Sequence, residues 1–444
     1  MNKTQDVNSE LMRSEPDIVL HEPEHRNRTN QQPMVIPTQS SAFVATWTTA
    51  TSENLPDQKV VVSRSLDRGL NWTPPVGIDG PSGVVIDPVT MEVKDPGDAK
   101  QSQYSVLFEV PHTGRIYLFY HKNNGIADTR RDITGELRFV FSDDDAVTWS
   151  DPYTLQIRRV PADDPDPEVP VNWVCCTPMT ITNRGKVMMS FERWTSTECS
   201  PMPKNKLLES DSDVWFLRFD NILTETDPDK LKITMLPEGD TGLRVPFPKD
   251  ARVSVAQAPS VHSLSDGRLI CTMRTATGYI YHSISSDGGA SWKEPRPLRY
   301  VEGGPAMKHP TATCPLFKLR DGRFLQIFHN NDGTFNNAKP DDPPSGPSDT
   351  RRTRTPVWIA VGREVPFAQG QPIIFNKPKV LAANDFVPYG GGHMGNILAN
   401  TEIGTSPSLF EYDGQVYFFY PERKHFLLGK ILTAEQLSDF GLPL

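Results

Sequence analysis

Cysteine is scarce in this 444-residue sequence, which has five Cys residues and no CxxC pair. An odd and sparse set of this kind fits neither a disulfide framework nor a zinc site. No run of about 18 apolar residues occurs, so no helix is predicted to cross a membrane. The segment MNKTQDVNSELMRSEPD lacks the apolar stretch of a secretory signal. We therefore expect a cytoplasmic protein, or one whose leader has been removed.

Positive charge is not in excess, because 46 Lys and Arg residues face 55 Asp and Glu residues, for a net charge of −9. A chain of this balance has no basic field for nucleic-acid phosphates or anionic membranes, so neither is an expected partner. The sequence also lacks a metal-ligand cluster, a phosphate-binding Gly-rich loop and a nucleotide fingerprint. We accordingly predict no cofactor.

Long helical patterns are missing as well. The 41 Pro and 30 Gly residues are spread along the whole chain, which favours many short strands joined by turns. One short helix is predicted, in TAEQLSDFG near the C-terminus.

One motif recurs, Ser-x-Asp-x-Gly-x-x-Trp, which we call the Asp-turn. Full copies are SRSLDRGLNW, with Asp67 and Gly69, and SISSDGGASW, with Asp287 and Gly289. A third copy, FSDDDAVTW, has Ala146 where the others have Gly. The Asp accepts hydrogen bonds from the backbone N–H groups of the turn, Gly adopts positive φ, and Trp covers the apolar edge of a hairpin. The motif is therefore predicted to be structural.

A looser unit, strand–turn–strand with alternating apolar residues, occurs six times, for example in PSVHSLSDGRLICTMRT and CPLFKLRDGRFLQIFHNND. Asp-Gly turns between such runs are strong hairpin signals. Six units that cannot bury their faces alone predict an all-β protein, a six-bladed β-propeller. We assign residues 31–444 to one propeller domain and residues 1–30 to a polar tail or a ring-closing segment.

The three Asp-turns, the six units and their order resemble the sialidase superfamily, also called BNR-repeat proteins, over about residues 30–435. The resemblance implies a carbohydrate-active enzyme and a set of site residues. Two arginines that bind the substrate carboxylate in sialidases correspond to Arg274 and Arg354. The acid/base loop corresponds to SENLPDQ, which supplies Glu53 and Asp57.

Three further sialidase positions carry different residues here. The first arginine falls at Gln31 and Gln32, the supporting Glu at Ala258, and the Tyr nucleophile at Ser406. The chain is thus similar to sialidase-like proteins rather than to true sialidases.

Residues that follow equivalent strands of a propeller meet on one face, and here they are polar or charged. This argument adds two carboxylates to the catalytic candidates, Glu192 and Glu422. It also adds the candidate sugar-binding residues His329, Tyr420 and Arg423. His309, which opens the fifth unit in KHPTATCPLF, is a further candidate, because a His can donate or accept a proton.

Our preferred hypothesis is an exo-glycosidase that acts on a terminal acidic sugar of a glycan, which needs two carboxyl-type groups, or a Tyr and an acid, beside the bond. The second is a polysaccharide lyase, in which Arg neutralises a uronate and a His or Tyr removes a proton. The third is a propeller that binds glycans without turnover.

Overall fold

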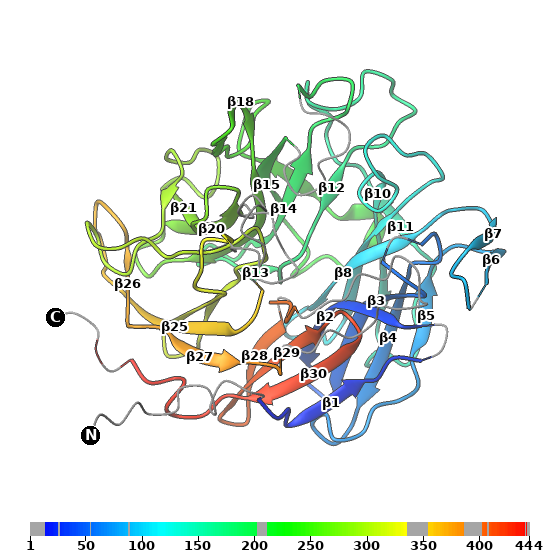
Figure 1. The fold of residues 1–444 in the computed structure, drawn as a ribbon, viewed down its shortest axis with the longest axis horizontal. Helices are drawn as coiled ribbons and strands as arrows, with labels where there is room; N and C mark the ends of the chain where they lie inside the picture. Colours follow the sequence, from blue (N-terminus) through cyan, green and yellow to red (C-terminus); the bar gives the residue numbers. More distant parts are fainter. Residues whose placement is uncertain are drawn as a thin grey trace, which may run out of the picture.

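The computed structural model describes residues 14–24, 27–53, 55–87, 89–201, 211–334, 354–385, 402–405, 408–439 and 441. Six antiparallel sheets, the blades, stand around one axis (Figure 1). The predicted six-bladed β-propeller is therefore confirmed.

The blades follow one another along the chain. Blade 1 contains β2 (Thr29–Pro37), β3 (Phe43–Ala50), β4 (Lys59–Ser65) and β5 (Val76–Asp79). Blade 2 contains β8 (Ser102–Glu109), β9 (Ile116–Lys122), β10 (Glu136–Ser142) and β11 (Tyr153–Leu155). Blade 3 contains β12 (Trp173–Val174), β13 (Thr180–Ile181), β14 (Val187–Trp194), β15 (Ser212–Phe219) and β16 (Ile233–Leu236).

Blades 4 and 5 repeat the pattern, and blade 6 uses both ends of the chain. Blade 4 contains β19 (Ala256–Ser263), β20 (Leu269–Thr275), β21 (Tyr281–Ser285) and β22 (Arg296–Pro297). Blade 5 contains β23 (Leu316–Lys318), β24 (Phe324–Phe328), β25 (Val357–Glu364), β26 (Ile373–Phe375) and β27 (Lys379–Ala382). Blade 6 contains β28 (Ser408–Tyr412), β29 (Gln415–Glu422), β30 (Phe426–Ile431) and β1 (Ile18–His21).

The N-terminal strand β1 closes the ring, because it pairs with β30 and Ile18 lies opposite Gly429. The core lies between the blades. All residues of β3, β9 and β14 are buried, because the second strand of a blade packs against neighbouring blades on both faces.

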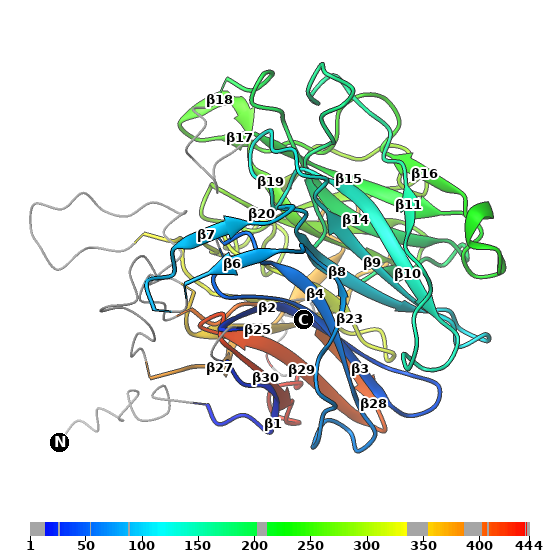
Figure 2. The ribbon, with the colours of Figure 1, turned by 90° about the vertical axis from the view of Figure 1, so that its right-hand side faces the viewer.

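Two hairpins and one short helix lie outside this plan. The hairpins β6 (Val84–Ile86) with β7 (Val93–Pro96), and β17 (Pro246–Phe247) with β18 (Asp250–Ser254), connect consecutive blades and project on the same side of the ring (left in Figure 2). The 3-10 helix η2 spans Pro228–Lys230. The helix predicted near the C-terminus is wrong: Leu437 N–H donates to Thr433 O, and the segment is a single turn. One turn forms too few hydrogen bonds to offset the cost of helix nucleation.

The Asp-turns have the predicted structure. In the second full copy, Asp287 Oδ1 accepts from Ser285 Oγ at 2.8 Å and from Ser291 N at 2.9 Å. Gly289 has φ +96°, and Trp292 Nε1 donates to its carbonyl at 3.1 Å. In the third copy Ala146 adopts φ +61°, so the turn forms even without Gly at this position.

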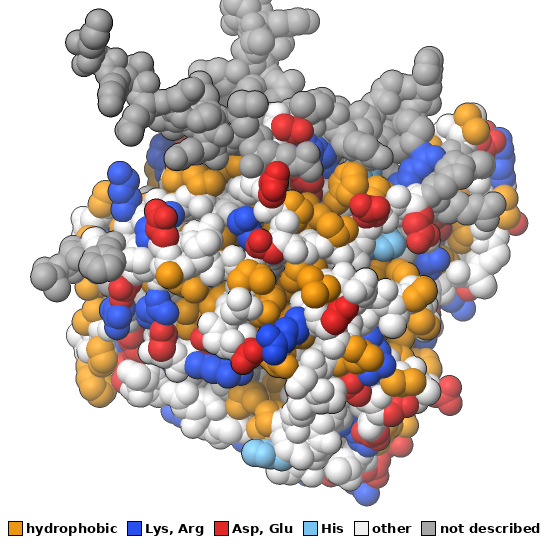
Figure 3. Space-filling view, turned by 90° about the horizontal axis from the view of Figure 1, so that it is seen from below, with side chains coloured by type: hydrophobic (Ala, Val, Ile, Leu, Met, Phe, Trp, Pro, Cys, Tyr) orange, Lys and Arg blue, Asp and Glu red, His pale blue; other side chains and the backbone are white. Residues whose placement is uncertain are grey.

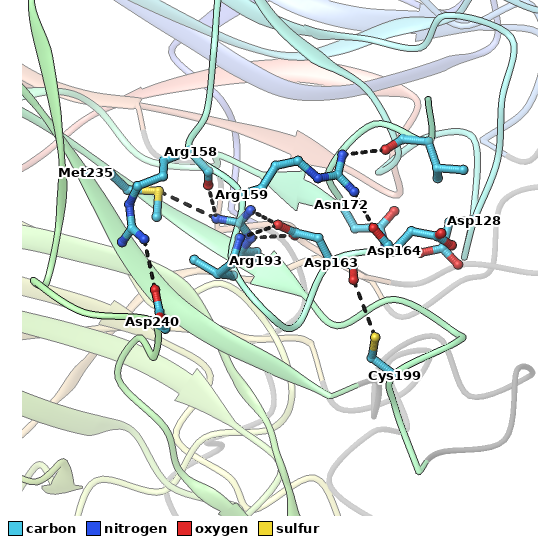
Figure 4. A network of polar contacts seen from close by, with 12 residues as sticks. Asp128, Arg158, Arg159, Asp163, Asp164, Asn172, Arg193, Cys199, Met235 and Asp240 are labelled. Atoms are coloured by element: carbon cyan, nitrogen blue, oxygen red, sulfur yellow. Dashed lines mark hydrogen bonds and ion pairs between the residues drawn. The ribbon is translucent and has the colours of Figure 1, made fainter. Parts of the chain in front are cut away.

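The Pro/Asp-rich segment 159–170 is held against blade 3 by a buried ion pair (Figure 4). The Arg193 guanidinium is 0% exposed, and its Nε donates to Asp163 Oδ1 at 2.8 Å. Arg193 Nη1 donates to Arg158 O at 2.9 Å, and Asp163 Oδ2 also accepts from Val160 N at 2.7 Å. This segment is therefore a defined loop rather than a loosely attached one.

No helix in the described part of the chain is long and apolar enough to cross a membrane. One side of the molecule, shown in Figure 3, carries Lys and Arg side chains interspersed with Asp and Glu. That side therefore presents no extended surface of one charge sign.

Candidate functional site

The inner strands of three blades bulge at the same place. The register shifts after Gln31 in β2, after Gln103 in β8 and after Gln257 in β19. The next residue in each has positive φ: +55° at Gln32, +54° at Tyr104 and +44° at Ala258. These bulges lie opposite the ends of the second strands, so they surround the ring axis at one face, which we call the mouth.

The second strands bring their last residues to this same face. Thr48 pairs with Gln31, His121 with Gln103, Glu192 with Val174 and Arg274 with Gln257. The residues predicted from the sequence to end equivalent strands therefore occupy equivalent positions in these four blades.

Glu192 and Arg274 meet beside Ala258. Glu192 is 2% exposed, its Oε2 accepts from Ala258 N, and its Oε1 accepts from Trp194 Nε1 at 2.9 Å. Arg274 Nη2 lies 3.7 Å from Glu192 Oε1, and Arg274 Nε donates to Gln257 at 3.1 Å. The resemblance predicts a Glu at position 258. Here a carboxylate from the neighbouring blade lies against the backbone of that position.

A second charged group joins blades 5, 6 and 1. Arg354 Nη1 lies 2.8 Å from Glu402 Oε2, and Arg354 Nη2 donates to Thr311 O at 2.8 Å. Lys424 Nζ contacts Glu402 Oε1 at 3.3 Å and Glu53 Oε1 at 2.7 Å. Charges therefore alternate along the row Arg354–Glu402–Lys424–Glu53, and each acid has a cationic neighbour.

The two predicted acid/base residues have different environments. The Glu53 side chain is 42% exposed and reaches Lys424. Asp57 Oδ2 accepts from Thr51 N at 2.9 Å and from Thr51 Oγ1 at 2.5 Å, which fixes the loop between β3 and β4. Burial raises the pKa of Asp57, although the hydrogen bonds from Thr51 oppose this. Glu53 is the accessible carboxylate of the loop, and Asp57 holds the loop in shape.

His309 and His329 are buried and stacked, with ring centroids 5.6 Å apart. His309 Nδ1 accepts from His329 N at 3.2 Å, and its Nε2 lies 2.9 Å from Ala312 O, so the ring carries its proton on Nε2. Burial, followed by the charge of Arg354, lowers the pKa of His329 to about 3. Burial lowers the pKa of His309 well below its usual value. The charge of His329 lowers it further, and the charges of Arg354 and Arg274 have smaller effects in the same direction. These shifts keep both rings uncharged at neutral pH; Arg354 acts on both, and Arg274 acts on His309.

The remaining predicted residues follow β29. Glu422 Oε1 lies 2.5 Å from Arg423 Nη1, and Arg423 Nη2 also pairs with Asp385. Tyr420 is 2% exposed and belongs to the hydrophobic cluster between blades 5 and 6, where its ring stacks on Phe418. Tyr420 therefore lies in the core rather than in the mouth.

Sequence reasoning missed Tyr104. Its side chain follows the bulge of β8, with the hydroxyl 3.5 Å from Asp132 Oδ2. Burial raises the pKa of the Tyr104 phenol, which also senses the charges of Glu53 and Glu192. A signal was present in the recurrence of QQP, QYS and QAP at the bulges. Glu402 and Lys424 were missed because no local pattern marks them. Ser406 lies outside the described residues.

A model of the BNR repeat-like domain matches residues 41–417. The chain belongs to this family. None of the curated proteins matches it.

Solved structures with the same fold include several sialidases. An intramolecular trans-sialidase from Ruminococcus gnavus, in complex with oseltamivir carboxylate, is 13% identical, with a TM-score of 0.58; the match covers 95% of this chain and 98% of that one. A point mutant of the NanB sialidase from Streptococcus pneumoniae is 9% identical, with a TM-score of 0.60 and coverages of 96% and 72%.

Two further matches have similar scores. A Hadza microbial sialidase is 15% identical, with a TM-score of 0.55; the match covers 92% of this chain, which spans only 66% of that protein. A protein of unknown function from Dyadobacter fermentans is 15% identical, with a TM-score of 0.54 and coverages of 94% and 98%. Identities this low establish the sialidase-like propeller fold alone.

Proposed function

We propose that this BNR-repeat protein is an exo-glycosidase that hydrolyses the bond to a terminal acidic sugar. The observation that carries the proposal is the pair Arg274 and Arg354 at the mouth, each beside a carboxylate, with both guanidinium charges acting on the same imidazole, His309. A guanidinium binds a carboxylate through two parallel hydrogen bonds, and two of them from neighbouring blades select an acidic sugar over a neutral one.

Hydrolysis also needs an acid that protonates the leaving oxygen and a second group across the bond. We assign the acid role to Glu53, whose side chain is 42% exposed, whereas Glu192 and Glu422 are buried. The second group is Glu192, which lies beside Arg274 at the mouth. The charges of Glu53 and Glu192 both act on the Tyr104 phenol, which supports a role for Tyr104 in contacting the sugar.

The hydrogen bonds of His309 favour hydrolysis over the lyase alternative. Both of its ring nitrogens are engaged with backbone groups, of Ala312 and His329, so this ring is not set to take a proton from a sugar carbon. In His329, Nδ1 lies 3.4 Å from Pro356 O, and the buried Nε2 has no partner in the described part of the chain. A lyase product is an unsaturated uronate, which ultraviolet absorbance detects directly.

The test compares an acidic aryl glycoside with its carboxamide, on the native protein and on Arg274→Lys and Arg354→Lys. Lys keeps the charge but loses the bidentate geometry. We expect kcat/KM to fall about ten- to a hundredfold for the acid and to change little for the carboxamide. Arg363→Lys, a 60%-exposed arginine on β25 of blade 5, is the matched control.

Two results contradict the proposal. Equal losses of kcat/KM for the acid and the carboxamide would show that the arginines do not bind the substrate carboxylate. Saturable binding of acidic glycosides without any turnover by the native protein would instead establish a glycan-binding propeller.

A further inference from the structure

A cavity of about 260 Å³ opens on the face opposite the mouth, between blades 3 and 4; we call it the basal cavity. Its floor is apolar and consists of Met188 at the start of β14 and Leu269 at the start of β20. Glu192 lies four residues further along β14, and a strand rises about 3.3 Å per residue. Met188 in the basal cavity and Glu192 at the mouth are thus about 13 Å apart along β14.

The charged lining of the basal cavity consists of three cationic side chains, Arg184, Lys186 and Arg218, and one carboxylate, Asp287. Both carboxylate oxygens of Asp287 accept hydrogen bonds within the Asp-turn, from Ser285 and Ser291. Lys186 Nζ donates to Asp220 O at 2.7 Å, and Arg218 Nε donates to Asp220 Oδ1 at 2.7 Å, so both are held in place. Arg184 is exposed and forms no hydrogen bond or ion pair with any residue in the described part of the chain. In a protein with net charge −9, an exposed arginine with no acidic partner among the described residues is available for an external anion.

The walls of the basal cavity are formed in advance. Asn183 N donates to Ser263 Oγ at 3.1 Å, and Asn183 Nδ2 donates to Leu264 O at 2.7 Å, which ties the β13–β14 turn to the β19–β20 turn of the next blade. Gly288 of the Asp-turn leaves room for the guanidinium, since a Cβ at Gly288 would lie 3.0 Å from Arg184 Nη1. A preformed cavity binds a ligand without the cost of ordering loops.

We infer that the basal cavity is a second, non-catalytic binding site for a carboxylated sugar unit. The carboxylate pairs with Arg184, next to Lys186 and to Arg218, whose charge is balanced by Asp220. The hydroxyl groups of the sugar meet the polar rim, and its ring lies above Met188 and Leu269, which are 1% and 3% exposed. This site does not depend on whether the mouth turns substrate over.

The test is a calorimetric titration with methyl β-D-glucuronide, methyl β-D-glucoside and glucose 6-sulfate. The native protein is compared with Arg184→Ala, and with Arg274→Ala combined with Arg354→Ala to disable the mouth. Arg184 is exposed and has no partner among the described residues, so we expect its truncation to leave folding intact, which the melting temperature verifies. Lys377→Ala removes an exposed cation on blade 5 and is the matched control.

We expect the mouth variant to retain one glucuronide site, and Arg184→Ala in that background to weaken it at least tenfold. Lys377→Ala should leave the affinity unchanged. Unchanged glucuronide affinity in Arg184→Ala, or equal affinity for the neutral glucoside, would overturn the proposal. Preference for the sulfate would overturn the carboxylate assignment. Because the mouth is disabled in these titrations, failure of the proposed hydrolase activity leaves their outcome unaffected.

Discussion

The ion pair between Arg193 and Asp163 offers a sharp test of how the 159–170 loop is held (Figure 4). The Arg193 side chain is 0% exposed and the Asp163 side chain 2%. Asp163→Asn keeps the shape of the side chain but leaves the guanidinium charge buried without its counter-charge. Breaking a buried pair in this way costs about 3–5 kcal/mol of unfolding free energy.

The assay is guanidinium chloride unfolding followed by tryptophan fluorescence, because Trp215 lies 5.8 Å from the Arg193 guanidinium. The matched control is Asp240→Asn, since Asp240 pairs with the neighbouring Arg158 at 3.0 Å but is 65% exposed. A surface pair of this kind is worth about 0–1 kcal/mol. If Asp163→Asn costs no more than Asp240→Asn, the buried pair does not hold the loop.

A double variant, Asp163→Asn with Arg193→Met, distinguishes the pair from the loop itself. Because it removes the uncompensated charge, we expect it to be more stable than Asp163→Asn alone. Under native conditions trypsin should cleave after Arg158 and Arg159 faster in Asp163→Asn than in the Asp240→Asn control. Equal cleavage rates would show that the loop keeps its place without the pair.

Two further predictions concern pH and the Asp-turns. Burial lowers the pKa of His121 to about 3, so below pH 6.5 the unfolded chain binds a proton that the folded chain does not, and stability should fall between pH 6.5 and 5. His121→Leu should reduce that slope in unfolding titrations, and an unchanged slope would refute the reasoning. Asp144→Ala should lower the free energy of unfolding by about 1–2 kcal/mol, because Asp144 accepts from Ser142 and Thr148, and should leave sugar affinity unchanged. Lost sugar binding at a native melting temperature would contradict a purely structural role for that turn.

The fold was predictable because its signals are local. An Asp-turn is complete within eight residues: Ser142, Asp144 and Thr148 form the same contacts as in the other two copies, even with Ala146 in place of Gly. Hairpin turns likewise require only neighbouring residues, so the repeat count followed from the sequence.

The site was less predictable because its contacts join distant segments. Glu192 reaches Ala258 across 66 residues, and Lys424 reaches Glu53 across 371. Such pairs depend on which blades are neighbours and on how each inner strand bulges. The sequence therefore indicated the acid/base loop, but not that Glu53 would face Lys424 while Asp57 bonds to Thr51.

The pairing of β1 with β30 has a consequence for the order of synthesis. Ile18 leaves the ribosome long before its partner Gly429. Until Gly429 is made, blade 6 lacks the pairing of β1 with β30 and the ring is open, so sheet edges next to the gap stay uncovered. The closing step is therefore a late, long-range event, of the kind that makes folding slow. Once formed, the pairing of β1 with β30 closes the ring, so any blade that opens must break contacts with two neighbours rather than one.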